Sequence, residues 1–440
     1  MDRATPSLIM TAAPTKTRWW ILFLISLMYL ICYMDRTSIS IAAPSISAEF
    51  GLSKAQMAIV FSAFAWAYAL GQVPGGWLGD RFGPRIVLTC MMTWWALTAA
   101  LNGAARGLVS LIAARFLLGF GEAGAFPVAN RGMQLWFARS ERGRISGVTH
   151  SFARLAGAIT PFVAASILLA FGWRAIFYIF GSLGFIWAIG FRLFYRNRPE
   201  DHARVNRGEL AQIRGVNADG AIQQLDARKR PAVPWASILH SRNMWSLALA
   251  YGCFFYGSYF FLTWYPTYML EYRHLTLKSL GIVGSLPLFT AMFGEITGGA
   301  LADFIYRKTG KLRFSRRVIA APAMLLSGIF VIPAAMTDSV WIAILFLSIS
   351  SFFLDMVVGP SWAVTMDVGG QFSGTVAALM NMTGALGASI SPVVFGFFAA
   401  QSSWVAPFFV NAAILLTGTL IWTFLIDPEK SVIGTAGAAD

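Results

Sequence analysis

Residues 111–131 have the sequence LIAARFLLGFGEAGAFPVANR, which is apolar enough to cross a lipid bilayer and yet contains Arg115 and Glu122. Seven residues make nearly two helical turns, so both charged side chains face the same way, about 10 Å apart. A charged side chain at the centre of a membrane costs about 2.5–3.5 kcal/mol on insertion scales, and such residues usually have a function. We therefore expect an anion-binding arginine beside a proton-accepting carboxylate, as in a transporter. The alternative is an internal Arg–Glu pair that fixes helix packing.

The composition indicates a protein that crosses the membrane several times. Of the 440 residues, 57% are hydrophobic and 12% are charged, about half the charged fraction of a soluble domain. The net charge of +14 comes from Lys and Arg in short loops between apolar runs, which is typical of topology determinants and not of a nucleic-acid-binding face. The three cysteines and four histidines show neither a disulfide framework nor metal-ligand spacing. We expect no metal, no cofactor and no nucleic-acid partner.

The apolar runs predict an all-α membrane protein with about twelve spanning helices. The first span begins at Trp19 and is expected to stay uncleaved, because no small-residue cleavage site closes a short apolar core. Further spans of about twenty residues or more are expected near 55–79, 84–104, 107–130, 144–170, 173–195, 243–270, 277–305, 316–336, 339–366, 372–400 and 403–426. These divide the chain into an N-terminal tail (1–18), a six-helix bundle (19–195), a linker (196–242), a second six-helix bundle (243–426) and a C-terminal tail (427–440). The linker is expected to be a solvated connector with some amphipathic helix.

Loop charges predict the orientation, because basic residues collect on the cytoplasmic side. One side holds Lys16, Arg18, Arg81, Arg85, Arg139, Arg142, Arg144, the linker, Arg307, Lys308, Lys311, Arg313, Arg316 and Arg317. The other side holds Lys54, Arg106, Arg174, Arg273 and Lys278. We expect a multi-pass protein of a bacterial-type inner membrane with both termini in the cytoplasm.

A repeated motif supports the two sets of six helices. GGWLGDRFGPR at 75–85 and GGALADFIYRKTG at 298–310 join equivalent spans, and both have Gly-Gly-x-Leu-x-Asp before a basic cluster. Parallel repeats related by an axis along the membrane normal place a substrate site between the halves. The charged residues of the two motifs are predicted to act in gating, through ion pairs that form in one access state and break in the other. They are Asp80, Arg81, Arg85, Asp303 and Arg307. The alternative is that they only set the topology.

Several stretches resemble a known family. GGWLGDRFGPR resembles the cytoplasmic loop motif of the major facilitator superfamily. CYMDRTSISIAAPSI at 32–46, FSAFAWAYALGQVPGGW at 61–77 and ARFLLGFGEAGAFPVANRGMQLWF at 114–137 together resemble its anion:cation symporter branch. That branch contains bacterial transporters for galactonate, glucarate and hexuronates and, more distantly, sialin and the vesicular glutamate transporters. The resemblance is strongest in the first four spans, and it implies the major facilitator fold, with two six-helix pseudo-repeats around a central cavity.

The resemblance also implies roles for single residues. Proton coupling falls to Asp35 and Glu122, and substrate binding to Arg36, Arg115, Tyr33, Tyr68, Trp362 and Asn381. The chain departs from the galactonate type in its fifth span, where HSFARLAGAITP includes Arg154. We count Arg154 among the substrate-binding residues, and a packing or snorkelling role is its alternative. Glu295 and Asp355 either line the second half of the cavity or, for Glu295, pair with loop charges.

These features predict a monomeric, proton-coupled symporter that imports a small organic anion, with a sugar acid (aldonate, aldarate or hexuronate) favoured as substrate. A guanidinium group binds a carboxylate through two parallel hydrogen bonds, and a cavity acid that gains and loses an arginine partner can exchange a proton. An aromatic carboxylate or another dicarboxylate is the alternative substrate. A cation exporter is disfavoured because the expected cavity is net basic. An enzyme is disfavoured because no Ser/His/Asp constellation or HExxH motif appears.

Overall fold

The computed structural model describes residues 13–215, 232–275, 285–401 and 403–433, and every regular element in these ranges is helical. The N-terminal half comprises α1 (Thr17–Phe50), α2 (Lys54–Phe82), α3 (Pro84–Gly103), α4 (Leu108–Glu122), α5 (Ala125–Trp136), α6 (Arg142–Phe171) and α7 (Trp173–Phe194). The C-terminal half comprises α10 (Arg242–Thr263), α11 (Tyr265–Thr267), a π-helical turn (Tyr268–Tyr272), α13 (Leu286–Thr309), α14 (Leu312–Met336), α15 (Val340–Asp355), α16 (Val358–Gly369), α17 (Ser373–Ala400) and α18 (Ala406–Phe424). Two short helices, α8 (Arg207–Arg214) and α9 (Trp235–His240), lie in the linker.

The number of membrane crossings agrees with the predicted twelve. Ten helical segments of the described residues are long and apolar enough to cross a membrane. One of them, Val340–Phe398, has 59 residues and contains two crossings, α15–α16 and α17. Helix α2, with 29 residues, is also long enough to cross, although it is not among the ten. Residues 276–284, at the start of the span expected near 277–305, lie outside the described ranges.

Two crossings are interrupted, and both continue beyond their expected ends. The span expected at 107–130 continues to Trp136 and breaks between α4 and α5, while the span expected at 339–366 continues to Gly369 and breaks between α15 and α16. Each break packs against the first glycine of a repeated motif. A Cβ atom on Gly75 would lie 2.4 Å from the Cα of Gly124, and one on Gly298 would lie 2.1 Å from the carbonyl oxygen of Met356. Only glycine permits such close packing of the two backbones.

The aspartate of each motif joins the two halves. Asp80 accepts hydrogen bonds from the backbone N–H groups of Gly374 (3.1 Å) and Thr375 (2.7 Å), at the start of α17. Asp303 likewise accepts from the N–H groups of Gly143 (3.1 Å) and Arg144 (2.6 Å), at the start of α6. A carboxylate is stabilised there by unpaired N–H groups and by the helix dipole. The repeat seen in the sequence is therefore a pair of equivalent contacts that cross the boundary in opposite directions.

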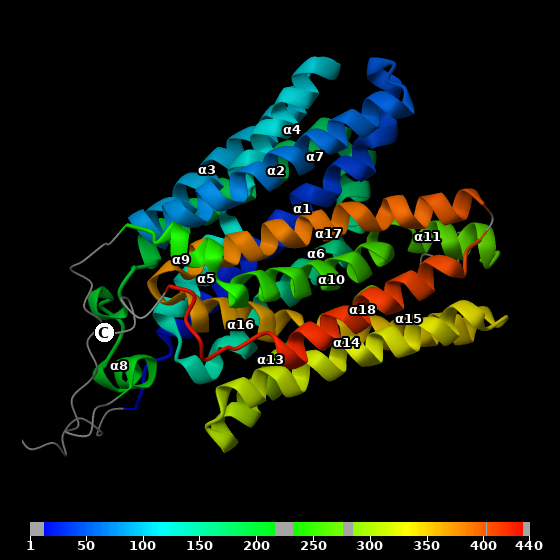
Figure 1. Cartoon of the computed structure of the whole chain (residues 1–440). Helices are drawn as coiled ribbons and strands as arrows, with labels where there is room; N and C mark the ends of the chain where they lie inside the picture. The colour runs from blue at the N-terminus through cyan, green and yellow to red at the C-terminus, as the bar shows by residue number, and fades with distance from the viewer. Residues whose placement is uncertain (1–12, 216–231, 276–284, 402, 434–440) are drawn as a thin grey trace, which may run out of the picture.

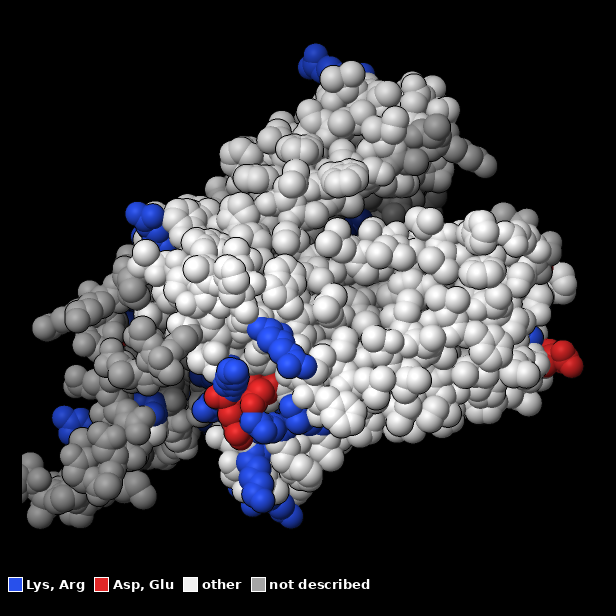
Figure 2. Space-filling view, viewed as in Figure 1, with Lys and Arg blue, Asp and Glu red and all other residues white. Residues whose placement is uncertain are grey.

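The two halves meet at one end of the molecule and separate at the other. Figure 1 shows α8 and α9 at the end where the halves converge, which we call the linker end, and the opposite end is the far end. The halves contact each other through α6 with α13 and α16, and through α17 with α2 and α5. Figure 2 shows the surface hollowed between the halves toward the far end, with a Lys or Arg side chain inside the hollow. The cleft therefore opens at the far end.

The described part of the linker contains a helix, α8, that packs against the N-terminal half. Glu209 of α8 is fully buried and accepts hydrogen bonds from the N–H groups of Thr17 (3.2 Å) and Arg18 (2.8 Å), at the start of α1. Asn206 caps α8 by accepting from the N–H of Glu209 (2.9 Å). The buried carboxylate stabilises the first turn of α1, where backbone N–H groups have no partner within the helix. The amphipathic helix expected in the linker is therefore present as α8, and it packs against the start of α1.

Candidate substrate site between the two halves

Four charged side chains lie together inside the N-terminal half, and we call them the N-terminal cluster: Asp35, Arg36, Arg115 and Glu122. They come from α1 and α4. Arg36 Nε donates a hydrogen bond to Glu122 Oε1, and Trp95 Nε1 donates to Asp35 Oδ2. Asp35, Arg115 and Glu122 are each at most 3% exposed. Two cations and two acids thus share one buried space.

Arg36 is the member of this cluster that aromatic rings surround. Its guanidinium carbon lies 4.3 Å from the ring centre of Tyr68, 5.1 Å from Tyr33, 5.3 Å from Phe126 and 5.4 Å from Phe64. Ring faces attract a cation and fix its position. The Arg36 side chain keeps 19% of its surface exposed, whereas the Glu122 side chain is fully buried. Arg36 is therefore held in place and still accessible.

The partners within this cluster differ from those expected. Glu122 receives its hydrogen bonds from Arg36 and from the thiol of Cys32, and it has no hydrogen bond from Arg115. Arg115 lies over the ring of Phe64 at 4.7 Å. The two residues of α4 are near enough to interact electrostatically. The ion pair that forms is therefore Arg36–Glu122, and the alternative of a packing pair between Arg115 and Glu122 is not what the structure shows.

Several polar atoms of the N-terminal cluster are buried and have no hydrogen-bond partner among the described residues. They are Asp35 Oδ1, Arg36 Nη2, Arg115 Nε and Nη1, and Glu122 Oε2. A buried polar group without a partner costs about 1–3 kcal/mol, and more when it is charged. The free nitrogens can donate to an anionic group, and the free carboxyl oxygens can hold a proton. The arrangement is suited to binding both.

A second set of charged groups crosses the boundary between the halves, and we call Arg154, Glu295 and Asp355 the bridging cluster. Arg154, on α6, donates from Nε to Glu295 Oε1 of α13 (3.2 Å) and from Nη2 to Asp355 Oδ1 of α15. Its Nη2 also lies 3.3 Å from the hydroxyl of Ser258 on α10. Glu295 and Asp355 are each 2% exposed. Arg154 therefore does not snorkel toward the membrane surface, and Glu295 pairs with it and not with loop charges.

The count of charges corrects one expectation. The cavity was expected to be net basic, with three arginines against Asp35 and Glu122. The structure adds Glu295 and Asp355 as buried partners of Arg154, so the two clusters together contain three guanidinium groups and four carboxyl groups. The groups are therefore not net basic unless some of the carboxyl groups hold protons.

Of the remaining residues expected to bind substrate, Tyr68 and Asn381 lie together across the boundary. Asn381 Nδ2, on α17, lies 3.3 Å from the Tyr68 hydroxyl and 2.7 Å from Gln72 Oε1, both on α2. Trp362 is fully buried, donates to the Tyr251 hydroxyl (2.7 Å) and packs against His150. Trp362 therefore presents no surface to a ligand in this state.

The residues predicted to act in gating separate into two groups. Asp80 and Asp303 make the contacts between halves described above, and Arg316 pairs with Asp303 at 2.6 Å. In contrast, Arg85 donates to the Arg192 carbonyl within the N-terminal half (2.9 and 3.2 Å). Arg81 lies over the ring of Trp77 at 5.2 Å, and Arg307 is exposed. The structure thus places the two aspartates in hydrogen bonds between the halves, whereas Arg85 binds a carbonyl of its own half and Arg307 is exposed.

Sequence reasoning missed three residues of these networks. Cys32 is four residues before Arg36 on α1, a spacing that puts both on one helix face. Asp367 pairs with Arg142 (2.8 Å) and Arg139 (3.2 Å) across the boundary, and the signal for it was an acid within the apolar run of α16. Ser258 carried no signal, because a serine in an apolar helix usually bonds to its own backbone.

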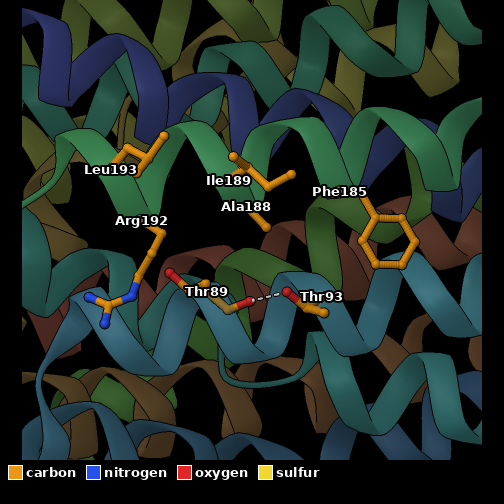
Figure 3. A pocket seen from close by; sticks show the side chains of 7 residues that line it. All are labelled: Thr89, Thr93, Phe185, Ala188, Ile189, Arg192 and Leu193. Atoms are coloured by element: carbon orange, nitrogen blue, oxygen red, sulfur yellow. Dashed lines mark hydrogen bonds between the residues drawn. The ribbon is translucent and has the colours of Figure 1, made fainter.

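A groove on the outer surface is separate from this site. Figure 3 shows Thr89 and Thr93 of α3 facing Phe185, Ala188 and Ile189 of α7, with Arg192 and Leu193 at one end. Its volume is about 270 Å³. Because all its lining residues belong to the N-terminal half, it does not lie between the halves.

Comparison with known proteins identifies the family. The family model described as Major Facilitator Superfamily matches residues 25–392 of this chain. A probable sulfoacetate transporter, SauU of Cupriavidus necator, is 38% identical over 93% of this chain and 94% of its own length. A probable galactarate/D-glucarate transporter, GudP of Bacillus subtilis, is 32% identical over 95% and 94%. A D-galactonate transporter of Escherichia coli is 30% identical over 96% and 98%.

Solved structures agree in fold. The fucose:proton symporter FucP of Escherichia coli has a TM-score of 0.72 at 13% identity, over 94% of this chain and 100% of that one. The human organic anion transporter MFSD10 has a TM-score of 0.69 at 16% identity, over 93% and 100%. Because the family match covers most of the sequence and the relatives are similar from end to end, this chain belongs to the Major Facilitator Superfamily.

Proposed function

We propose that this protein is a proton-coupled symporter that imports a small organic anion, with sugar acids (aldonates, aldarates and hexuronates) as the favoured substrates. Relatives at 30–38% identity are named as transporters of sulfoacetate, of galactarate or D-glucarate, and of D-galactonate. These names support an organic anion as the cargo. The family is one of transporters, so we propose no enzymatic activity.

The observation that carries proton coupling is the charge count of the buried groups. Arg36, Arg115 and Arg154 are the cations available to a substrate, and four carboxyl groups lie beside them. An added anion would make this low-dielectric region more negative, which is costly unless the charge is balanced. Protonation of a carboxyl group supplies that balance and frees its arginine for the substrate. Anion binding and proton binding are thus linked by electrostatics.

The geometry suggests how binding leads to transport. An anionic group that enters the cleft from the far end meets Arg36, whose Nη2 has no partner, and Glu122 accepts a proton when its arginine turns to the substrate. Rocking of one half against the other would then close the far end and open the linker end. That motion breaks the contacts of Asp80 and Asp303 with α17 and α6, which suits them as gating residues.

Aromatic carboxylates are the second candidate substrates. The rings of Tyr33, Phe64, Tyr68 and Phe126 surround Arg36, and rings beside a cation can pack on a planar aromatic acid. A sulfonate can occupy the same guanidinium fork as a carboxylate, so sulfoacetate belongs in the test as well.

We also propose a cellular setting. Basic loop residues favour the cytoplasm, which would place the linker end, both termini and α8 on that side of a bacterial-type inner membrane. Both clusters lie within one chain, so a monomer contains a complete site. The proton is the coupling ion, and the mechanism uses no metal and no cofactor.

Uptake into proteoliposomes tests this proposal. Labelled D-galactonate, D-glucarate, a hexuronate, sulfoacetate and a hydroxybenzoate are supplied with and without an inward proton gradient. We expect one of these acids to accumulate against its own gradient only when protons flow inward. The Glu122→Gln variant should still exchange that acid but should not accumulate it. The absence of gradient-driven uptake of every acid, with intact protein, would contradict the proposal.

A further inference from the structure

We infer that Glu295 and Asp355 form a second proton-binding site, whose protonation depends on whether Arg154 contacts the two acids or the substrate. This inference rests on the proposed proton-coupled transport and goes beyond it, because it places a coupling proton in the C-terminal half. The sequence resemblance assigns proton coupling to Asp35 and Glu122, and both of these lie in the N-terminal half.

The first argument is geometric. Arg154 Nε and Nη2 lie on the same edge of the guanidinium group, the edge that ordinarily binds both oxygens of one carboxylate. In this structure that edge binds one oxygen of Glu295 and one of Asp355. Two neighbouring nitrogens of one guanidinium bring two different carboxyl groups side by side. Each carboxyl group therefore lies within range of the charge on the other.

The second argument is charge balance. One arginine and two ionised acids would leave a net negative charge among residues that are 2% exposed. The other titratable groups that face this cluster are Tyr33, Tyr251, Tyr259 and His150. A tyrosine never carries a positive charge, and a histidine is mostly neutral at pH 7, so none of these groups balances the second acid. Carboxyl groups that share one buried site commonly hold one proton between them. The bridging cluster is neutral when its two acids share one proton.

The third argument is an atom with no partner. Glu295 Oε2 is buried and accepts no hydrogen bond, so it offers a position for a further proton. When an anionic group of the substrate takes the guanidinium of Arg154, the two acids lose their counter-charge. They then become neutral by binding that second proton, so one anionic charge and one proton enter the cluster together. The acids are on α13 and α15 and the arginine is on α6, so this exchange also loosens a contact between the halves.

The test measures the number of protons carried per anion. Proteoliposomes are loaded with the acid that the wild type accumulates, and the proton gradient at which its net flux reverses gives the stoichiometry. We expect the double variant Glu295→Gln/Asp355→Asn to carry one proton fewer per anion than the wild type, because it has no carboxyl group to protonate when the substrate takes Arg154. Either single variant keeps one carboxyl group, which is ionised beside Arg154 at rest and binds one proton when the substrate takes the arginine, so each should keep the wild-type value. The double variant Glu271→Gln/Asp338→Asn makes the same chemical changes at exposed positions and should also keep the wild-type value.

A binding measurement keeps the inference testable if a variant no longer transports. Addition of the same acid to detergent-solubilised protein in weak buffer should draw one proton fewer from solution in the double variant Glu295→Gln/Asp355→Asn, as a pH-sensitive dye reports. An unchanged proton count in this double variant would overturn the inference while leaving symport intact. A wild type that accumulates no acid under a proton gradient would instead overturn the proposed function.

Discussion

The N-terminal cluster and the bridging cluster are both buried sets of arginines and acids, but they differ in which parts of the chain supply them. Every charged group of the first comes from α1 and α4 in one half, and it contains two cations and two acids. The second takes its arginine from α6 in one half and its acids from α13 and α15 in the other, with one cation for two acids. One set is balanced and internal, whereas the other is unbalanced and crosses the boundary.

This difference indicates two roles. If each half moves as a rigid body, contacts within a half keep their geometry, whereas contacts across the boundary are free to change. The N-terminal cluster can therefore hold the substrate through the whole cycle. The bridging cluster can change its contacts with one half when the other half binds substrate. The following predictions separate the two roles.

The largest effect is expected from loss of the cation within the N-terminal cluster. Arg36→Ala removes the ion pair with Glu122 and leaves that acid buried without a cationic hydrogen-bond donor. Loss of a buried cation that pairs with the bound anion costs about 2–5 kcal/mol of binding free energy, which corresponds to a fall of about 30-fold or more in uptake at low substrate concentration. Initial rates of uptake, normalised to folded protein in the membrane, provide the measurement. Arg106→Ala, at an exposed position of the same half, should transport as the wild type does.

An intermediate effect is expected from the bridging cluster, and it concerns the populations of the access states instead of the rate of uptake. Arg154→Gln removes an ion pair that joins the halves while the far end is open, so it should shift the population toward the state in which the far end is closed. A change of about tenfold in the ratio of the two populations corresponds to about 1.4 kcal/mol. Spin labels at positions 106 and 338, in exposed loops, would report a shorter mean distance, with the exposed Cys90 replaced by serine. An unchanged distance distribution in Arg154→Gln, or an equal shift in Arg36→Ala, would remove the distinction between the clusters.

Much of the fold could be predicted because the required signals are local. Apolar runs of about twenty residues identify spans, and the Gly-Gly-x-Leu-x-Asp repeat identified the two halves. The breaks after Glu122 and Asp355 could not be predicted in this way. Each break depends on a glycine of another helix, Gly75 or Gly298, that lies far away in the sequence.

The candidate site was predicted as a set of residues but not as a set of contacts. Charged residues within apolar runs, such as Arg115 and Glu122, are visible in the sequence because membrane burial makes them unusual. Which acid pairs with which arginine depends on the packing of different helices. The partner of Glu122 is Arg36, on another helix, and the acids that bind Arg154 come from the other half. The sequence identified Glu295 and Asp355 as candidate cavity acids but could not decide whether they lie beside Arg154, so it left open whether the acids outnumber the arginines.

The smallest effect is expected from an uncharged contact between the halves, the one that Tyr68 makes. Tyr68→Phe keeps the ring over Arg36 and removes only the hydroxyl that meets Asn381 of the other half at 3.3 Å. A hydrogen bond of this kind contributes about 0.5–1 kcal/mol, so the apparent affinity for the transported acid should fall about two- to fivefold. Tyr68→Ala also removes the ring that holds Arg36 and should cause a clearly larger loss. Equal losses in the two variants would mean that the contact with Asn381, and not the position of Arg36, accounts for the role of Tyr68. The distinction between a binding cluster and a bridging cluster would then not hold at this residue.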